Sequence, residues 1–155
     1  NDDIVEEVSG SCFCCNFNGF ADAIKHLQEQ NNSDIIFAEP VGSCTDLSAT
    51  IMQPVKEKYS DILNLKQLTV LADPTRLKAV LKDHSNPGDY IIYKQFEEAD
   101  VILINKVELL SEKELAELVE ATKKEFNNEN VLTTSVKTGE GLDEWFNQII
   151  ITNSH

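Results

Sequence analysis

Asp100-Val101-Ile102-Leu103-Ile104-Asn105 is the stretch that decides the fold, because four consecutive apolar residues are closed at each end by a polar one. A short run of this kind is typical of a β-strand that is covered on both faces. Residues 34–38 and 67–72 have the same character, residues 130–134 form a fourth run, and residues 4–8 form a shorter, partly apolar one. The sequence therefore predicts four buried strands and one short strand before them.

Segments with helical signals lie between and after these strands. Their apolar residues recur three or four positions apart, and two segments open with a recognisable N-cap. Asp73 precedes Pro74 in one of them, and Ser111 starts a capping box in the other. Pro54 should kink or break a third segment. The predicted helices cover residues 20–30, 45–59, 74–81, 90–98, 111–126 and 142–150.

Strand and helix alternate along the chain, which implies parallel strands joined by right-handed crossovers in a three-layer α/β fold. The chain of 155 residues contains no internal repeat, low-complexity tract or linker, so residues 1–155 are predicted to form one domain. Ligands of such sheets bind beyond the carboxyl ends of the strands. The residues that directly follow each strand are therefore the candidates for a site.

The composition excludes several classes of function. The net charge of −14 and the isoelectric point near 4.5 argue against a nucleic-acid partner and against an anionic membrane surface. No apolar run approaches the roughly 20 residues that a membrane-spanning helix needs. Four cysteines in a chain of this length do not form a secreted disulfide framework and indicate a reducing compartment, so we expect a cytoplasmic protein.

Three of these cysteines lie within four positions, as Cys12-Phe13-Cys14-Cys15. Thiolates are soft ligands, and three of them could supply most of a tetrahedral or trigonal metal shell. Cys12 and Cys14 share a face of an extended segment, and a bend in residues 16–19 would bring Cys15 to them. From spacing alone three interpretations stay open: a metal site, a redox pair at Cys14 and Cys15, and cysteines packed as small apolar residues.

Two loops after strands carry motifs of nucleotide-binding proteins. Asn105-Lys106-Val107-Glu108 resembles the Asn-Lys-x-Asp motif of GTPases, in which the carboxylate accepts two hydrogen bonds from guanine and the lysine stem lies over the purine ring. Residues 134–142 resemble the Ser-Ala-Lys loop with its Gly-x-Gly-Leu continuation, whose backbone contacts the guanine oxygen. The resemblance implies a guanine site formed by Asn105, Lys106, Glu108, Ser135, Val136 and Lys137.

Glu39-Pro40-Val41-Gly42, after the run of residues 34–38, is similar to the Walker B and switch segment of the same proteins. The similarity implies that Glu39 is the catalytic residue, which supports Mg²⁺ or the attacking water, and that the Gly42 amide senses the terminal phosphate. With the cysteine motif upstream, the order of motifs over residues 5–150 resembles the CobW/HypB/UreG metal-handling P-loop GTPases, most closely the CobW-like branch.

This resemblance implies a P-loop NTPase-type sheet and a GTP-binding metallochaperone or metal-insertion domain related to the CobW proteins of cobalamin biosynthesis. GTP with Mg²⁺ would bind across the strand ends, and GTP hydrolysis would be coupled to metal handling. Zn²⁺ or Co²⁺ would bind at Cys12, Cys14 and Cys15, with Cys44 of the switch loop as either a further ligand or a simple thiol. A client metalloprotein or corrinoid-related protein would be the partner, and a homodimer is one way to complete the metal shell.

The chain departs from the family pattern at three places. No Gly-x-x-x-x-Gly-Lys-[Ser/Thr] occurs in it, so the phosphate-binding loop, expected before the cysteine motif with a first strand and helix, is absent. Glu108 stands in place of the motif's Asp, and Ser11, preceded by Gly10, stands where the family usually has Gly. We therefore expect an N-terminally truncated domain that is inactive as a GTPase by itself.

The expected truncation has a consequence for the sheet, because the missing first strand normally lies at its centre. The strands at Ile35 and Leu68 would then flank a gap with exposed edges. We expect either displacement of these strands or filling of the gap by another segment or chain. The alternative to the GTPase interpretation is a nucleotide-independent metal-binding or thiol-redox module that keeps the fold.

Overall fold

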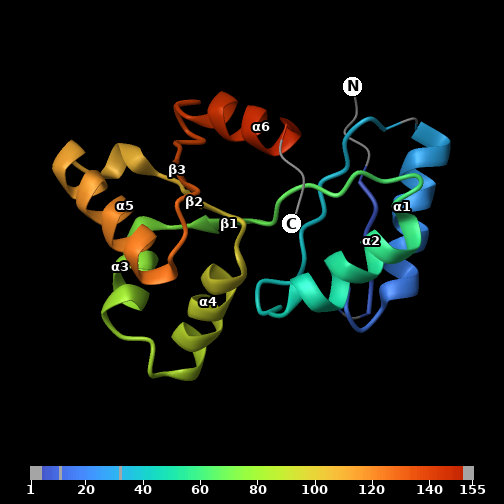
Figure 1. The fold of residues 1–155 in the computed structure, drawn as a ribbon, viewed down its shortest axis with the longest axis horizontal. Coiled ribbons are helices and arrows are strands. Elements are labelled where there is room, and N and C mark those ends of the chain that lie inside the picture. Colours follow the sequence, from blue (N-terminus) through green and yellow to red (C-terminus); the bar gives the residue numbers. More distant parts are fainter. Residues whose placement is uncertain (1–4, 11, 32, 152–155) are drawn as a thin grey trace.

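The computed structural model describes residues 5–10, 12–31 and 33–151 of the chain, and Figure 1 shows the order of its elements. The strands of this part are β1 (Thr69–Ala72), β2 (Val101–Ile104) and β3 (Val131–Thr133). Its α-helices are α1 (Phe17–Asn31), α2 (Gln53–Tyr59), α3 (Pro74–Lys82), α4 (Pro87–Glu98), α5 (Glu112–Phe126) and α6 (Leu142–Ile151). A π-helix (Ser48–Met52) precedes α2, and a short 3₁₀-helix (Val107–Leu109) follows β2.

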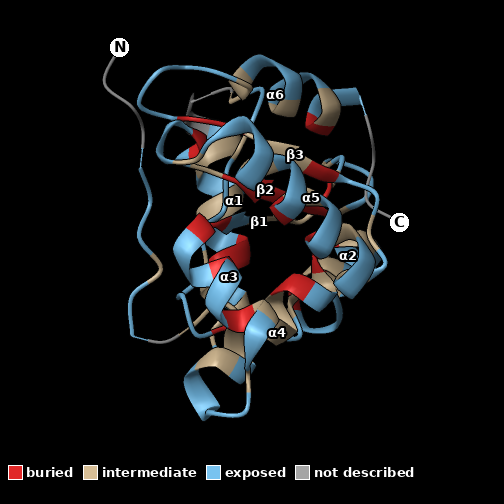
Figure 2. Ribbon diagram, turned by 90° about the vertical axis from the view of Figure 1, so that its left-hand side faces the viewer, coloured by how far each residue is buried: buried red, intermediate tan, exposed pale blue. Residues whose placement is uncertain are grey.

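The sheet has the order β1-β2-β3, and both pairs of neighbouring strands are parallel. Ala72 of β1 lies opposite Ile104 of β2, and Ile104 lies opposite Thr133 of β3. All four residues of β2 are buried, as the apolar run predicts. Helix α6 lies on one side of the sheet, and α3 and α4 lie on the other (Figures 1 and 2). The predicted three-layer α/β fold with a parallel sheet is therefore confirmed.

The predicted helices are all present, and their caps explain where they begin. Asp73 caps α3 by accepting from the amides of Thr75 and Arg76, and the capping box of Ser111 and Glu114 opens α5. Helix α4 begins earlier than predicted because Asn86 accepts a hydrogen bond from the Asp89 amide and caps it. An asparagine followed by proline is a common helix start, so the sequence did contain this signal.

Pro54 marks a change of helix type and not an end of the helix. The π-helix runs directly into α2, so Pro54 at the start of α2 lies inside one continuous helix, and the wider π turn before it accommodates a residue that has no amide to donate. Leu47, Ile51 and Val55 face one side, as predicted, and pack in a hydrophobic cluster with Phe20 of α1. This cluster is separate from the core that surrounds the sheet.

The predictions of strands at residues 34–38 and 4–8 were wrong for the described residues. Residues 34–38 form no strand, and the side chains of Ile35 and Phe37 are 48% and 63% exposed. An apolar run becomes a strand only if its backbone finds a partner, and no described segment pairs with the outer edge of β1. Residues 5–8 also lie outside any strand, and residue 4 lies outside the described residues.

The displacement expected around Ile35 agrees with this arrangement. Residues 34–38 lie apart from the sheet, and the Phe37 ring meets Trp145 of α6 at 6.2 Å between centroids. The second flanking strand, β1, stays in the sheet as an edge strand, with Leu71 60% exposed. No helix in the described part of the chain has the length and apolar content that crossing a membrane requires.

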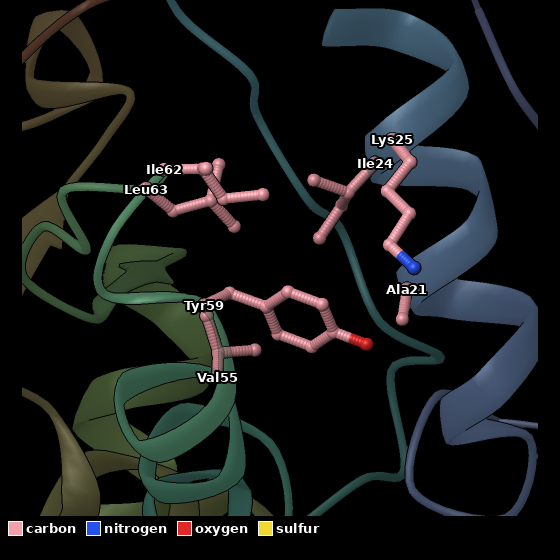
Figure 3. Close-up of a pocket in the computed structure, with 7 residues that line it drawn as sticks. All are labelled: Ala21, Ile24, Lys25, Val55, Tyr59, Ile62 and Leu63. Atoms are coloured by element: carbon pink, nitrogen blue, oxygen red, sulfur yellow. The ribbon is translucent and has the colours of Figure 1, made fainter.

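A small apolar pocket lies between α1 and α2 (Figure 3). Figure 3 shows the Tyr59 hydroxyl pointing across it toward α1, and the Lys25 ammonium lies 5.5 Å from the centre of the Tyr59 ring. The lining consists of Ala21, Ile24, Lys25, Val55, Tyr59, Ile62 and Leu63. This lining contains no cluster of nucleophilic or metal-binding side chains, so the candidate functional groups are those at the strand ends and the cysteines.

Candidate nucleotide-base and metal sites

The loops after β2 and β3 stay hydrogen-bonded to the sheet where the strands end. The Asn105 amide donates to the Ala72 carbonyl at 2.9 Å, and the Thr134 amide donates to the Ile104 carbonyl at 2.8 Å. The Val107 amide then reaches the Thr134 carbonyl at 3.3 Å. Both predicted base-recognition loops therefore meet at the carboxyl edge of the sheet, as parallel strands require.

Asn105 joins the two loops through one oxygen. Its Oδ1 accepts from the Lys106 amide at 2.7 Å and from the Val136 amide at 3.0 Å. Lys106 has a φ of 60°, a left-handed conformation that is uncommon for residues other than glycine. The hydrogen bond from its amide to the Asn105 side chain stabilises this turn. Asn105 thus holds the backbone of Lys106 and Val136 in fixed relation.

Glu108 interacts electrostatically with the neighbouring loop. The Ser135 side chain is fully buried, and its hydrogen bond with Glu108 is the largest cause that lowers the pKa of the Glu108 carboxyl. The positive charges of Lys137 and Lys106 lower this pKa further. Ser135 Oγ also accepts from the Thr138 amide at 3.2 Å. The Glu108 carboxyl is therefore more acidic than an ordinary glutamate and favours its ionised form.

The turn after Ser135 depends on a close backbone approach. The Ser135 amide and the Thr134 hydroxyl both donate to the Glu140 carbonyl, at 2.9 and 2.7 Å. Gly141 follows with a φ of +73°, and a Cβ on it would lie 2.1 Å from the Thr133 carbonyl oxygen. Only glycine fits there without moving the backbone. The second glycine of the Gly-x-Gly signal thus has a steric cause.

Asp73 is a further residue of this edge, which the sequence places directly after a strand and explains as a helix cap and not as a catalytic acid. It follows β1 directly, and its Oδ2 lies 2.8 Å from the Lys106 ammonium. This contact lowers the pKa of the Asp73 carboxyl and raises the pKa of Lys106. The sequence did contain a signal for this contact, because Asp73 and Asn105 directly follow neighbouring parallel strands and so lie at the same edge of the sheet. The role of Asp73 as a helix cap was a sufficient explanation of the aspartate, so the contact with Lys106 was not predicted.

The cysteine motif bends earlier than predicted, within residues 12–16 and not 16–19, because α1 already begins at Phe17. The amides of Cys15 and Asn16 both donate to the Cys12 carbonyl, at 3.0 and 3.1 Å, and α1 begins at Phe17. The Sγ atoms are 2.8 Å apart for Cys12 and Cys14, 3.3 Å for Cys12 and Cys15, and 3.9 Å for Cys14 and Cys15. The turn at the start of α1 therefore gathers all three thiols.

The thiols differ in acidity because they contact one another. Hydrogen bonds with Cys14 and Cys15 lower the pKa of Cys12 to about 7. Hydrogen bonds with Cys12 and Cys14 raise the pKa of Cys15 to about 11. Tetrahedral Zn²⁺ with bonds of about 2.3 Å would need sulfurs about 3.8 Å apart. The cluster needs only a small spreading of Cys12 from its two neighbours, so the three thiols fit a thiophilic metal.

Cys44 lies near enough to Cys12 to respond to its charge, but outside the group of thiols whose sulfurs are within 4.8 Å of one another. Its side chain is buried, and burial is the main cause that raises the pKa of its thiol, followed by the charge of Cys12 and a hydrogen bond with it. Gln95 Nε2 of α4 donates to the Gly42 and Cys44 carbonyls at 3.0 and 2.8 Å. This glutamine, which the sequence did not single out, holds the loop that carries Cys44.

Glu39 and Gly42 are not brought to the base-binding loops. Both are exposed, and no strand precedes them among the residues that the structure describes. The same loop continues to Leu47, whose amide donates to the Glu98 carboxylate at 2.8 Å. Glu98 ends α4 just before β2 begins, so this loop lies near the amino end of β2 and Asn105 follows its carboxyl end. Lys137, another of the predicted site residues, is exposed, and its positive charge lowers the pKa of Glu108.

The comparisons with known proteins place this geometry in a family. A family model described as CobW/HypB/UreG, nucleotide-binding domain, matches residues 1–133. No curated protein and no solved structure matches the chain. The match ends at residue 133 and does not cover the loop of residues 134–142, which contacts Asn105 through the Val136 amide. Because the model covers most of its length, the chain belongs to the CobW/HypB/UreG family of nucleotide-binding domains.

Proposed function

We propose that this nucleotide-binding domain recognises guanine at the edge formed by the loops after β2 and β3 and carries a thiophilic metal at its cysteine cluster. The observation that carries the proposal is the geometric linkage of the two loops, in which Asn105 Oδ1 accepts from the Val136 amide and the Val107 amide donates to the Thr134 carbonyl. Such mutual support orients the polar groups of a site before a ligand arrives.

Guanine and adenine differ in the hydrogen bonds that Glu108 can accept. A carboxylate accepts from the ring N–H and the exocyclic amino group of guanine, whereas adenine offers no N–H at that ring position. Hydrogen bonds to a charged group contribute about 1.5–3 kcal/mol, which corresponds to roughly 10- to 150-fold in affinity. The stem of Lys106 supplies an apolar surface for the ring.

The metal proposal rests on the three gathered sulfurs. Cys12, Cys14 and Cys15 would bind Zn²⁺ or Co²⁺, and Cys44 is the nearest candidate for a fourth thiolate. The lowered pKa of Cys12 supports this proposal, because metals bind the thiolate form. The same acidity also suits a thiol-redox module, which is the second candidate function.

GTP hydrolysis needs a phosphate-binding loop, and the 155 residues contain none. In a protein that also supplies this loop, we propose that Glu39 supports Mg²⁺ or the attacking water and that Gly42 senses the terminal phosphate. Hydrolysis would then alter the loop that carries Cys44 and so change the metal site. The metal would pass to a client metalloprotein or a corrinoid-related protein.

Titration of the chain with Co²⁺ and Zn²⁺ tests the metal proposal. Thiolate-to-Co²⁺ absorption should develop with one ion per chain and should be lost when Cys12, Cys14 and Cys15 are replaced together by serine. Unchanged Co²⁺ affinity in the triple variant would refute the assignment. Formation of a disulfide under mild oxidation, without Co²⁺ binding in the reduced protein, would favour the redox module.

Titration with guanosine and adenosine, followed by NMR of the Asn105 and Val136 amides, tests the base proposal. Guanosine should shift both amides, and adenosine should bind at least tenfold more weakly. Glu108→Gln is the informative variant, because it keeps the size of the side chain and removes the charge. Equal affinity for both nucleosides in the unchanged protein would contradict guanine recognition.

A further inference from the structure

The Asp73 carboxylate divides its two oxygens between two tasks. Oδ1 accepts from the amides of Thr75 and Arg76 at 2.9 and 3.2 Å and caps α3. Oδ2 accepts from the Lys106 ammonium at 2.8 Å. The cap needs only one oxygen, and an asparagine would provide it equally well. The second oxygen is therefore not needed for the cap and serves Lys106, whereas the negative charge favours both Lys106 and the positive end of the helix dipole.

The sheet register makes this contact possible. Ala72 and Ile104 lie opposite each other in the parallel pair of β1 and β2, so the residues that follow them leave the sheet side by side. The Asn105 amide still donates to the Ala72 carbonyl, which ties the two chain segments together at this point. The left-handed turn at Lys106 then leaves its side chain within reach of Asp73.

The ion pair is exposed, with 53% of the Lys106 side chain and 38% of the Asp73 side chain accessible. Exposed pairs contribute little to the stability of a fold. A free lysine, however, samples many rotamers, and a ligand that needs one of them must select it. With its ammonium held at Asp73, the methylene stem of Lys106 stays at the end of β2, beside the base-binding loops.

We propose that Asp73 is a positioning residue of the base site, which holds the Lys106 ammonium so that the purine ring meets the lysine stem already in place. This inference rests on the proposed guanine function. It assigns Asp73 a role in base affinity that its helix cap does not require. It also predicts that the charge of Asp73, and not its capping oxygen, contributes to binding.

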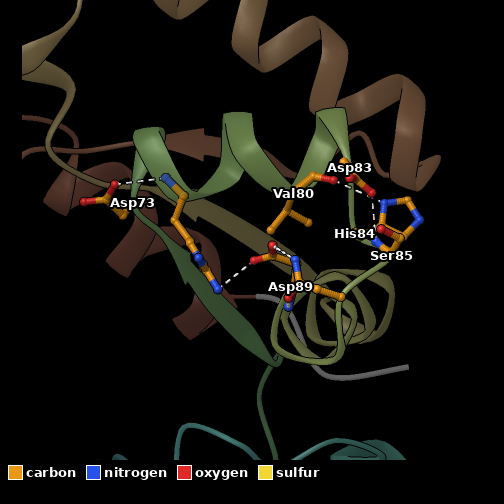
Figure 4. Close-up of polar contacts among 8 residues, drawn as sticks. Asp73, Val80, Asp83, His84, Ser85 and Asp89 are labelled. Carbon is orange, nitrogen blue, oxygen red and sulfur yellow. Dashed lines mark hydrogen bonds and ion pairs between the residues drawn. The ribbon is translucent and has the colours of Figure 1, made fainter.

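Asp73→Asn separates the two tasks, because it keeps the cap and removes the charge. The matched control is Asp83→Asn, which makes the same change at the other end of α3, where Asp83 accepts from the Ser85 amide at 2.9 Å (Figure 4). An exposed ion pair corresponds to about a two- to fivefold effect. Guanosine affinity should fall by this factor in Asp73→Asn and stay unchanged in Asp83→Asn, with urea midpoints near that of the unchanged protein in both.

A double-mutant cycle with Lys106→Met completes the test, because methionine keeps an apolar stem without the charge. In that background Asp73→Asn should have no further effect on guanosine affinity. Two results would overturn this inference and leave the proposed function standing. One is equal guanosine affinity in Asp73→Asn and the unchanged protein, and the other is the same loss of affinity from Asp73→Asn whether residue 106 is lysine or methionine. Absence of guanosine binding in the unchanged protein would instead overturn the proposed function.

Discussion

Gly141→Ala should destabilise the domain far more than the same change at a neighbouring glycine. The backbone at Gly141 has a φ of +73°, and an added Cβ would lie 2.1 Å from the Thr133 carbonyl oxygen and 3.1 Å from its carbon. The left-handed conformation costs about 1–2 kcal/mol for alanine. Displacing the backbone of β3 adds about 1–3 kcal/mol. The expected loss is about 2–5 kcal/mol, a large part of a typical domain stability.

Gly139→Ala is the matched control, because Gly139 has a similar φ of +84° and no atom within 4 Å of an added Cβ. It should cost only the conformational part, about 1–2 kcal/mol. Urea unfolding can be followed by the fluorescence of Trp145, the single tryptophan, whose indole donates to the Thr69 hydroxyl at 3.1 Å. Equal losses of stability in the two variants would show that the approach of Gly141 to Thr133 is not close, and would refute the reasoning.

Three further predictions concern the sites. Alkylation of Cys12 by iodoacetamide in the metal-free protein should reach half its maximal rate near pH 7, which is the lowered pKa of this thiol. Mass spectrometry should find Cys15 unmodified at that pH. Equal labelling of the two cysteines would contradict the difference in acidity. Guanosine binding should weaken as the pH falls through the depressed pKa of Glu108. In Ser135→Ala this loss of binding should begin at a higher pH, because the hydroxyl that lowers the Glu108 pKa is gone. The same pH profile in the variant and the unchanged protein would argue against the contact between Ser135 and Glu108. Gln95→Ala should release the loop that carries Cys44, so the Cys44 amide should exchange its hydrogen faster while the amides of β2 stay protected. Unchanged exchange at Cys44 would show that Gln95 does not hold the loop.

The signals that the sequence carries are local, and they predicted most of the framework. The capping box at Ser111 and the Asp73–Pro74 start depend on hydrogen bonds between residues two or three positions apart, so the residue types alone determine them. The apolar run of residues 101–104 became the fully buried central strand β2. The bend that gathers Cys12, Cys14 and Cys15 is also local, since it is one turn that leads into α1.

What only the tertiary structure decided depends on partners that are distant in the chain. Residues 34–38 have the apolar pattern of a strand, but no described segment offers their backbone a partner, and the chain stays irregular there. Gln95 gained its role from a loop some fifty positions earlier, and Asp73 met Lys106 through the register of β1 and β2. The sequence by itself therefore determined the helices, the central strand and the thiol turn, whereas the residues that meet across the sheet edge were decided by strand pairing, which no local pattern encodes.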